Sequence, residues 1–208
     1  MNARTVSRSA DHPIEDFFTA RWSPRAFTAE TVSEPELLGL LEAARWAPSG
    51  LNAQPWRFVY SFRGEVEFDA ILASLWTGNQ VWAKNAAALI AVAAKTTLIP
   101  PGADKEIVNP SYGFDAGAAW GYFAIQAHLN GWSSHAMGGF DAERAAEAIA
   151  MPDGYAMQVV IAVGKRASAE TLPEVLRNRE TPSPRRPITE SAFRGKFAFL
   201  ADTDGYQP

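Results

Sequence analysis

Two arginines and a serine lie within five residues of one another, as Arg21, Ser23 and Arg25. A guanidinium matches phosphate oxygens in a bidentate fashion, and a serine hydroxyl adds a further donor. A second cationic pair, Arg185 and Arg186, lies near the C-terminus. Taken alone, each cluster is more often a solvated surface turn than a binding site. Together they are candidates for an anion site that other residues have to support.

The loop from Pro48 to Trp56 is a candidate of a different kind, because it concentrates polar side chains in a stiff frame. Ser49, Asn52 and Gln54 can each donate or accept a hydrogen bond. The two prolines limit the entropy that the loop loses when it holds a ligand. Gly50 permits a close approach of the backbone. A purely structural loop could share these features, but this density of amides favours ligand binding.

Several standard catalytic motifs are absent from the sequence. It contains no G-x-G-x-x-G, no P-loop and no G-x-S-x-G. None of His12, His128 and His135 has metal-ligand spacing to another histidine. The chain has no cysteine, which excludes disulfides, thiolate catalysis and cysteine-bound metals. We therefore predict no catalytic side chain and no metal ligand, and binding of an anion and a heterocycle remains.

The composition is that of a globular domain. The chain has 208 residues, of which 47% are hydrophobic and 20% charged. The net charge of −4 makes a nucleic-acid partner a poor expectation, since such partners need a basic face. No apolar signal-peptide core follows the first residues, and the longest apolar run, 86–94, is shorter than the ~20 residues of a membrane span. We expect a cytoplasmic protein without membrane or nucleic-acid partners.

Hydrophobic periodicity predicts helices and strands without regular alternation, which indicates an α+β fold with helices covering a small sheet. The run 86–94 is either a buried strand or a helix, and 96–111 is a loop or a lid. The predicted helices are about 13–20, 34–47, 68–75, 115–130 and 141–149, and the predicted strands are 56–62 and 157–163.

Two of these helices have recognisable starts. Ser33 and Glu36 have capping-box spacing, and Pro48 ends the helix that follows. Asp115 is expected to cap a later helix that ends before Gly131. Small residues in that helix, at positions 113, 117 and 121, indicate close packing, either within one subunit or across a dimer interface.

From about Phe17 to Pro187, the chain resembles the FMN-dependent nitroreductase family. Any one of its motifs is weak, whereas six in this order are specific. They are Arg21-x-Ser23-x-Arg25 followed by Phe27, the Ala47–Trp56 match to A-P-S-x-x-N-x-Q-P-W, Asn79 ahead of Trp82, Asp115 starting a helix that ends at Asn130-Gly131, Gly138-Gly139-Phe140-Asp141, and Arg185-Arg186-Pro187.

The resemblance implies a nitroreductase-like fold with a small, mostly antiparallel central sheet flanked by helices. It also implies an intertwined homodimer that binds FMN in a cleft between its subunits. Residues 1–208 would form a single domain, with about 1–12 as a loose N-terminus and about 182–208 as a C-terminal arm.

The family's cofactor contacts carry over by motif. The expected phosphate contacts are Arg21, Ser23, Arg25, Arg185 and the adjacent Arg186, with Trp22 beside the phosphate through its backbone. Asn79 would face the ribityl chain or the pyrimidine edge, and Gly138 and Gly139 would present amides to flavin N5 and O4. The double glycine departs from members with an acidic residue at the first position. The expected contacts from the partner subunit are Pro48, Ser49, Gly50 and Asn52.

The implied reaction is a ping-pong hydride transfer through flavin N5, with NADH or NADPH as donor. Nitroaromatics, quinones or similar flat acceptors would then take the place of the nicotinamide. Relatives with specialised substrates remain an alternative: aldehyde or enone reductases, flavin reductases and reductive dehalogenases, with the 96–111 segment deciding among them. A flavin-binding protein without turnover, or an interaction module without cofactor, are further alternatives that NAD(P)H oxidation and flavin uptake would distinguish.

Overall fold

The fold is built around a four-stranded sheet, seen in a computed structural model that describes residues 8–197. The strand order is β1-β2-β6-β5, and every neighbouring pair is antiparallel. The first residues of the predicted loose N-terminus and the end of the predicted C-terminal arm lie outside the described residues. The strands are β1 (Trp56–Phe62), β2 (Ala88–Lys95), β5 (Ser133–Met137) and β6 (Tyr155–Gly164).

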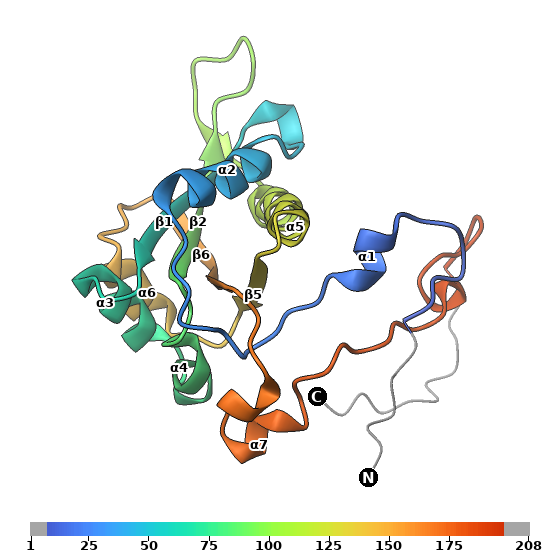
Figure 1. The fold of residues 1–208 in the computed structure, drawn as a ribbon. Coiled ribbons are helices and arrows are strands. Elements are labelled where there is room, and N and C mark those ends of the chain that lie inside the picture. The colour runs from blue at the N-terminus through green and yellow to red at the C-terminus, as the bar shows by residue number, and fades with distance from the viewer. Residues whose placement is uncertain (1–7, 198–208) are drawn as a thin grey trace.

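Helices cover both faces of this sheet (Figure 1). One face packs against α2 (Glu34–Arg45) and α5 (Tyr112–Leu129), and the other packs against α3 (Val66–Ser74), α4 (Thr77–Ala83) and α6 (Ala142–Ala148). The predicted α+β class is confirmed. The run 86–94 contains most of β2, whose residues up to Ala94 are all buried because this strand is central and covered on both faces.

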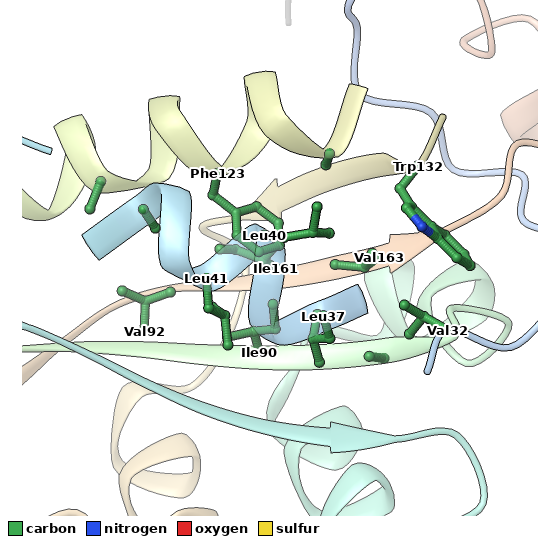
Figure 2. Close-up of a cluster of buried hydrophobic side chains, with 14 of the residues drawn as sticks. Val32, Leu37, Leu40, Leu41, Ile90, Val92, Phe123, Trp132, Ile161 and Val163 are labelled. Carbon is green, nitrogen blue, oxygen red and sulfur yellow. The ribbon is translucent and has the colours of Figure 1, made fainter. Parts of the chain in front are cut away.

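Leucines of α2 build much of one hydrophobic core. The helix begins as predicted with a capping box between Ser33 and Glu36, in which the Ser33 amide donates to the Glu36 carboxylate at 3.0 Å. Leu37, Leu40 and Leu41 then face the sheet at helical spacing. Figure 2 shows Leu40 in the same cluster as Phe123 of α5 and core residues of the sheet.

Several predicted elements differ from the structure. Asp115 does not cap its helix: α5 begins at Tyr112 after Ser111, and Asp115 is buried inside the first turn, where its carboxylate binds other groups. The first helix is only α1 (Asp16–Ala20). The 96–111 segment carries a hairpin of β3 (Thr97–Leu98) and β4 (Ile107–Val108).

Other elements were not predicted at all. Helix α4 and strand β5 are absent from the expectations because both are rich in small and polar residues. A short helix, α7 (Glu174–Arg177), lies between β6 and the C-terminal segment. That segment runs beside residues 8–20, away from the sheet (Figure 1), and the Ile188 amide donates to the Asp11 carboxylate at 2.7 Å.

Two leucines of α2, Leu38 and Leu40, allow a matched test of the core. Leu40 is fully buried, whereas Leu38 is 47% exposed. We expect Leu40→Ala to lower the free energy of unfolding by about 2–5 kcal/mol, because it removes buried methyl groups and leaves a cavity. Leu38→Ala should cost less than about 1 kcal/mol. Urea unfolding at a fixed protein concentration measures both, and equal losses would contradict this packing.

Candidate functional site

A cavity of about 300 Å³ gathers five arginines beside the end of β5. We call it the arginine cavity. Three separate stretches of chain meet there: the residues around α1, the strand β5, and the segment after α7. Its lining residues are Arg8, Arg21, Trp22, Ser23, Arg25, His135, Arg179, Thr181, Ser183 and Arg185.

Backbone contacts hold these distant stretches together. The amide of Arg25 donates to both carboxylate oxygens of Glu180, at 2.9 and 3.0 Å, and the amide of Ala26 donates to one of them at 2.9 Å. The Thr28 amide donates to the carbonyl of Lys165 at 2.9 Å, which fixes the same segment to the end of β6. The almost fully buried Glu180 therefore joins the first stretch to the last.

The arginines of the cavity repel one another. Burial lowers the pKa of Arg21, and the charges of Arg185 and Arg8 lower it further. Burial also lowers the pKa of Arg25, as does the charge of Arg179, while Glu180 acts in the opposite direction. Among the described residues, no ion pair involves an arginine of this cavity. Such a concentration of positive charge suits an anion with more than one charge, and phosphate matches the guanidinium donors.

His135 enters the cavity as a neutral side chain. Burial lowers its pKa from 6.5 to about 4; Arg25 and Arg21 lower it as well, while hydrogen bonds to the backbone of Pro24 and Ser23 oppose the shift. Its Nδ1 lies 3.0 Å from the carbonyl oxygen of Pro24, which makes Nδ1 the donor in the neutral ring. At neutral pH, His135 therefore adds no further cation to the cavity.

A second part of the site lies where β5 ends. The Nδ2 of Asn79 donates to the carbonyl of Gly139 at 3.0 Å, and the Trp76 amide donates to the same oxygen at 3.0 Å. A Cβ on Gly139 would lie 2.8 Å from Asn79 Nδ2 and 3.0 Å from the Trp76 ring, so no side chain fits there. Nothing lies within 4 Å of a Cβ on Gly138. The predicted Asn79 and the two glycines are thus brought together.

This corner is connected to the arginine cavity through an aromatic contact. The rings of Trp82, in α4, and His135 have centroids 4.7 Å apart. His135 and Gly138 are three residues apart in sequence, and a strand rises by about 3.3 Å per residue. The corner and the cavity therefore lie along one edge of the fold.

The Pro48–Trp56 loop lies at a different end of the molecule. The amide of its Gly50 contacts the carboxylate of Asp115, in the first turn of α5. His128, in the last turn of α5, lines a second cavity together with Arg21 and Trp22. The 18 residues of α5 span about 27 Å at 1.5 Å per residue. Within one chain, the loop with Pro48, Ser49, Gly50 and Asn52 thus lies about the length of α5 away from the residues of the arginine cavity.

The two C-terminal arginines, Arg185 and Arg186, have different surroundings. Arg185 lines the arginine cavity, whereas Arg186 does not. The Nε of Arg186 instead faces the Glu190 carboxylate at 3.9 Å, and both arginines line a further cavity of about 550 Å³ near α1. Five residues expected from the sequence to contact the cofactor line the arginine cavity: Arg21, Trp22, Ser23, Arg25 and Arg185.

Five other cavity residues were not predicted: Arg8, His135, Arg179, Thr181 and Ser183. Arg8, Arg179 and His135 belong to no motif, and each reaches the cavity only through tertiary packing. Within the described stretch, 8–197, no group of acidic residues and histidines could hold a metal ion, and no helix is long and apolar enough to cross a membrane.

Comparison with known proteins decides the family. The model of the Nitroreductase family matches residues 18–165. The chain belongs to the nitroreductase family. A solved structure described as an oxidoreductase containing FMN is 39% identical, with a TM-score of 0.88, and the match covers 95% of this chain and 99% of that one.

Two curated proteins add to this assignment. An uncharacterized 15.4 kDa protein of Mycolicibacterium smegmatis is 32% identical over 150 residues, which cover 68% of this chain and 97% of that protein. A Bacillus subtilis (strain 168) protein provisionally named NAD(P)H nitroreductase YdgI is 26% identical over 171 residues, which cover 67% of this chain and 81% of the relative. The family model and the FMN-containing solved structure confirm the resemblance inferred from the motifs.

The neutral His135 predicts a pH dependence of stability. Between about pH 4 and 6.5 the unfolded chain binds a proton at this residue and the folded chain does not. The free energy of unfolding should therefore fall as the pH falls through this window, by at most about 1.4 kcal/mol per pH unit. In His135→Gln this contribution is absent. Urea unfolding of flavin-free protein at several pH values measures both slopes, and parallel slopes would argue against a buried neutral histidine.

Proposed function

We propose that this chain is an FMN-dependent oxidoreductase that takes electrons from NADH or NADPH and passes them to nitroaromatics, quinones or similar flat acceptors. The observation that carries the proposal is the arginine cavity, where five cations meet on a nitroreductase fold. The 39% identical solved structure contains FMN, and the B. subtilis relative bears the name of an NAD(P)H nitroreductase, which support the cofactor and the donor.

The residues of the cavity fit the phosphate of FMN. Arg21, Arg25 and Arg185 would bind its oxygens, with Ser23 as a further donor. Arg8 and Arg179 would add charge, since neither has a carboxylate partner among the described residues. Burial and neighbouring positive charges lower the pKa of Arg21 and Arg25, and a bound, doubly charged phosphate would offset those positive charges. Arg186, held toward Glu190, would act on the phosphate only at longer range.

The corner at Asn79 and the two glycines suits the heterocyclic end of the cofactor. When bound, FMN supplies a carrier that accepts and donates a hydride. The backbone amides of Gly138 and Gly139 would stabilise negative charge on the reduced ring. Nothing in this chain lies within 4 Å of a Cβ on Gly138, so a flat ring could approach the backbone closely there. Asn79 holds the Gly139 carbonyl and so orients this peptide.

The Pro48–Trp56 loop would serve the partner subunit of an intertwined homodimer. Its distance from the arginine cavity supports this assignment. The small residues of α5 add to it: nothing in this chain lies within 4 Å of a Cβ on Gly117 or Gly121, so a second backbone could pack there. Phe114, on the same helix, is 83% exposed.

We also propose a single domain with residues 182–208 as an arm around the partner; the cytoplasmic location stays a prediction.

Charge removal in the cavity tests the phosphate contacts. We expect Arg21→Ala and Arg25→Ala each to weaken FMN binding by roughly 10- to 100-fold, because each removes a charge-assisted hydrogen bond worth about 1.5–3 kcal/mol. Arg144→Ala, an exposed arginine of α6, is the matched control and should bind FMN like the natural chain. Fluorescence titration of flavin-free protein measures the three affinities. Unchanged binding in both cavity variants would refute the phosphate assignment.

Anaerobic reduction tests the enzyme itself. Purified protein loaded with FMN should lose its yellow absorbance when NADH or NADPH is added without oxygen. It should recover that absorbance when a nitroaromatic or a quinone follows, as a ping-pong reaction requires. Flavin that stays oxidised with both nucleotides would favour a flavin-binding protein without turnover. A panel of acceptors with each nucleotide then gives the preferred donor and substrate.

A further inference from the structure

A buried polar cluster joins the Pro48–Trp56 loop to the hairpin of residues 96–111. Its centre is Asp115, which is 3% exposed. Both carboxylate oxygens lie 3.3 Å from the amide of Gly50, and Oδ2 also accepts from the Ser111 hydroxyl at 3.3 Å. Asn109, which is fully buried, accepts from the amide and the hydroxyl of Ser111 through its Oδ1, at 3.1 and 3.0 Å.

The cluster reaches the hairpin through Asn109. The backbone amide of Asn109 donates to the carbonyl of Thr96 at 2.8 Å, across the base of the hairpin. Its Nδ2 donates to no acceptor in the described part of the chain, so Asn109 serves the cluster as an acceptor. One carboxylate thus contacts the loop directly and the hairpin base through two further side chains.

The loop needs an anchor because its own conformation is strained. Three of its residues that are not glycine have positive φ angles: Leu51 at 52°, Asn52 at 55° and Gln54 at 46°. Such angles are unfavourable for residues with a Cβ and persist only where the surroundings impose them. Among the described hydrogen bonds to residues 49–54, those of Asp115 are the only ones from a group distant in sequence.

The contact also leaves no spare room. A Cβ on Gly50 would lie 2.9 Å from the Ser111 hydroxyl oxygen, while Asp115 Oδ2 and the Ser111 Cβ would lie at the ordinary distances of 3.9 and 4.0 Å. The absence of a side chain at Gly50 therefore allows the loop backbone to lie against the Ser111 hydroxyl. Packing within the chain favours glycine at this position, whether or not Gly50 also contacts a ligand.

We propose that Asp115 is a positioning residue: it fixes the Pro48–Trp56 loop in the conformation that reaches the partner subunit's flavin, and it ties that loop to the 96–111 hairpin. This inference rests on the proposed function for the flavin. Loss of the carboxylate releases the loop and speeds flavin dissociation, while the arginine cavity and the glycine corner stay intact.

The first test separates anchoring from flavin binding. In flavin-free protein, hydrogen exchange of the peptide containing residues 49–54 should be at least about tenfold faster in Asp115→Ala, since one charge-assisted contact is lost. Asp115→Asn keeps an acceptor oxygen for the Gly50 amide, so its exchange rate should lie between those of the natural chain and Asp115→Ala. Asp69→Asn, an exposed aspartate in α3, is the matched control and should exchange like the natural chain. Equal exchange in all four proteins overturns the anchor.

The second test uses flavin dissociation from the same proteins loaded with FMN. Asp115→Ala should release FMN about tenfold faster, with partial rescue in Asp115→Asn. Faster exchange of the loop with unchanged flavin release would overturn the positioning role. If the natural chain binds no FMN, the proposed function fails, while the exchange experiment still decides whether Asp115 anchors the loop.

A double mutant tests the close approach of Gly50 to Ser111 without Asp115 being changed. In flavin-free protein, Gly50→Ala should speed hydrogen exchange of residues 49–54, because its Cβ would lie 2.9 Å from the Ser111 hydroxyl oxygen. In the Ser111→Ala background that oxygen is absent, so the effect of Gly50→Ala should shrink by about fivefold. Additive effects of the two substitutions would show that the close approach does not position the loop and would overturn this part of the proposal.

Discussion

Mutual repulsion among the clustered arginines is the constraint on which the site depends. Five guanidinium groups line one cavity without a carboxylate partner among the described residues. Separate stretches of chain would move apart under this repulsion if nothing else joined them. Glu180 joins them, yet it binds backbone amides of Arg25 and Ala26 and forms no ion pair with an arginine head. The carboxylate of Glu180 thus links two chain segments through their backbone, and the guanidinium groups stay available to an anionic ligand.

Sequence patterns predicted the helices and strands that depend on interactions between residues close in sequence. The capping box at Ser33 and the leucine stripe behind it gave α2, and the aromatic and β-branched run after Pro55 gave β1. Strand β5 escaped because its residues, Ser133–Met137, are too polar and small to show a strand pattern; it is a strand because β6 pairs with it. Asp115 was misplaced for a similar reason, since an acidic residue near a helix start indicates a cap unless tertiary contacts bury it.

The candidate site divides in the same way. Arg21, Ser23 and Arg25 are close in sequence, so their type and spacing were enough to predict an anion site. Arg8, Arg179 and His135 become neighbours only when the N-terminal stretch, β5 and the segment after α7 meet, which no local pattern encodes. The proposed role of the Pro48–Trp56 loop toward a partner subunit came from resemblance alone, and the separation of the loop from the arginine cavity within one chain supports that proposal.

The length of α5 has a consequence for a proposed dimer that contains two differently substituted chains. Each flavin would draw its arginines from one chain and its loop from the other, because about 27 Å of helix separates the two in any single chain. A chain defective in the arginine cavity and a chain defective in the loop are then complementary. In a mixed dimer of the two, one site inherits both defects and the other inherits none, so two inactive proteins together regain one working site.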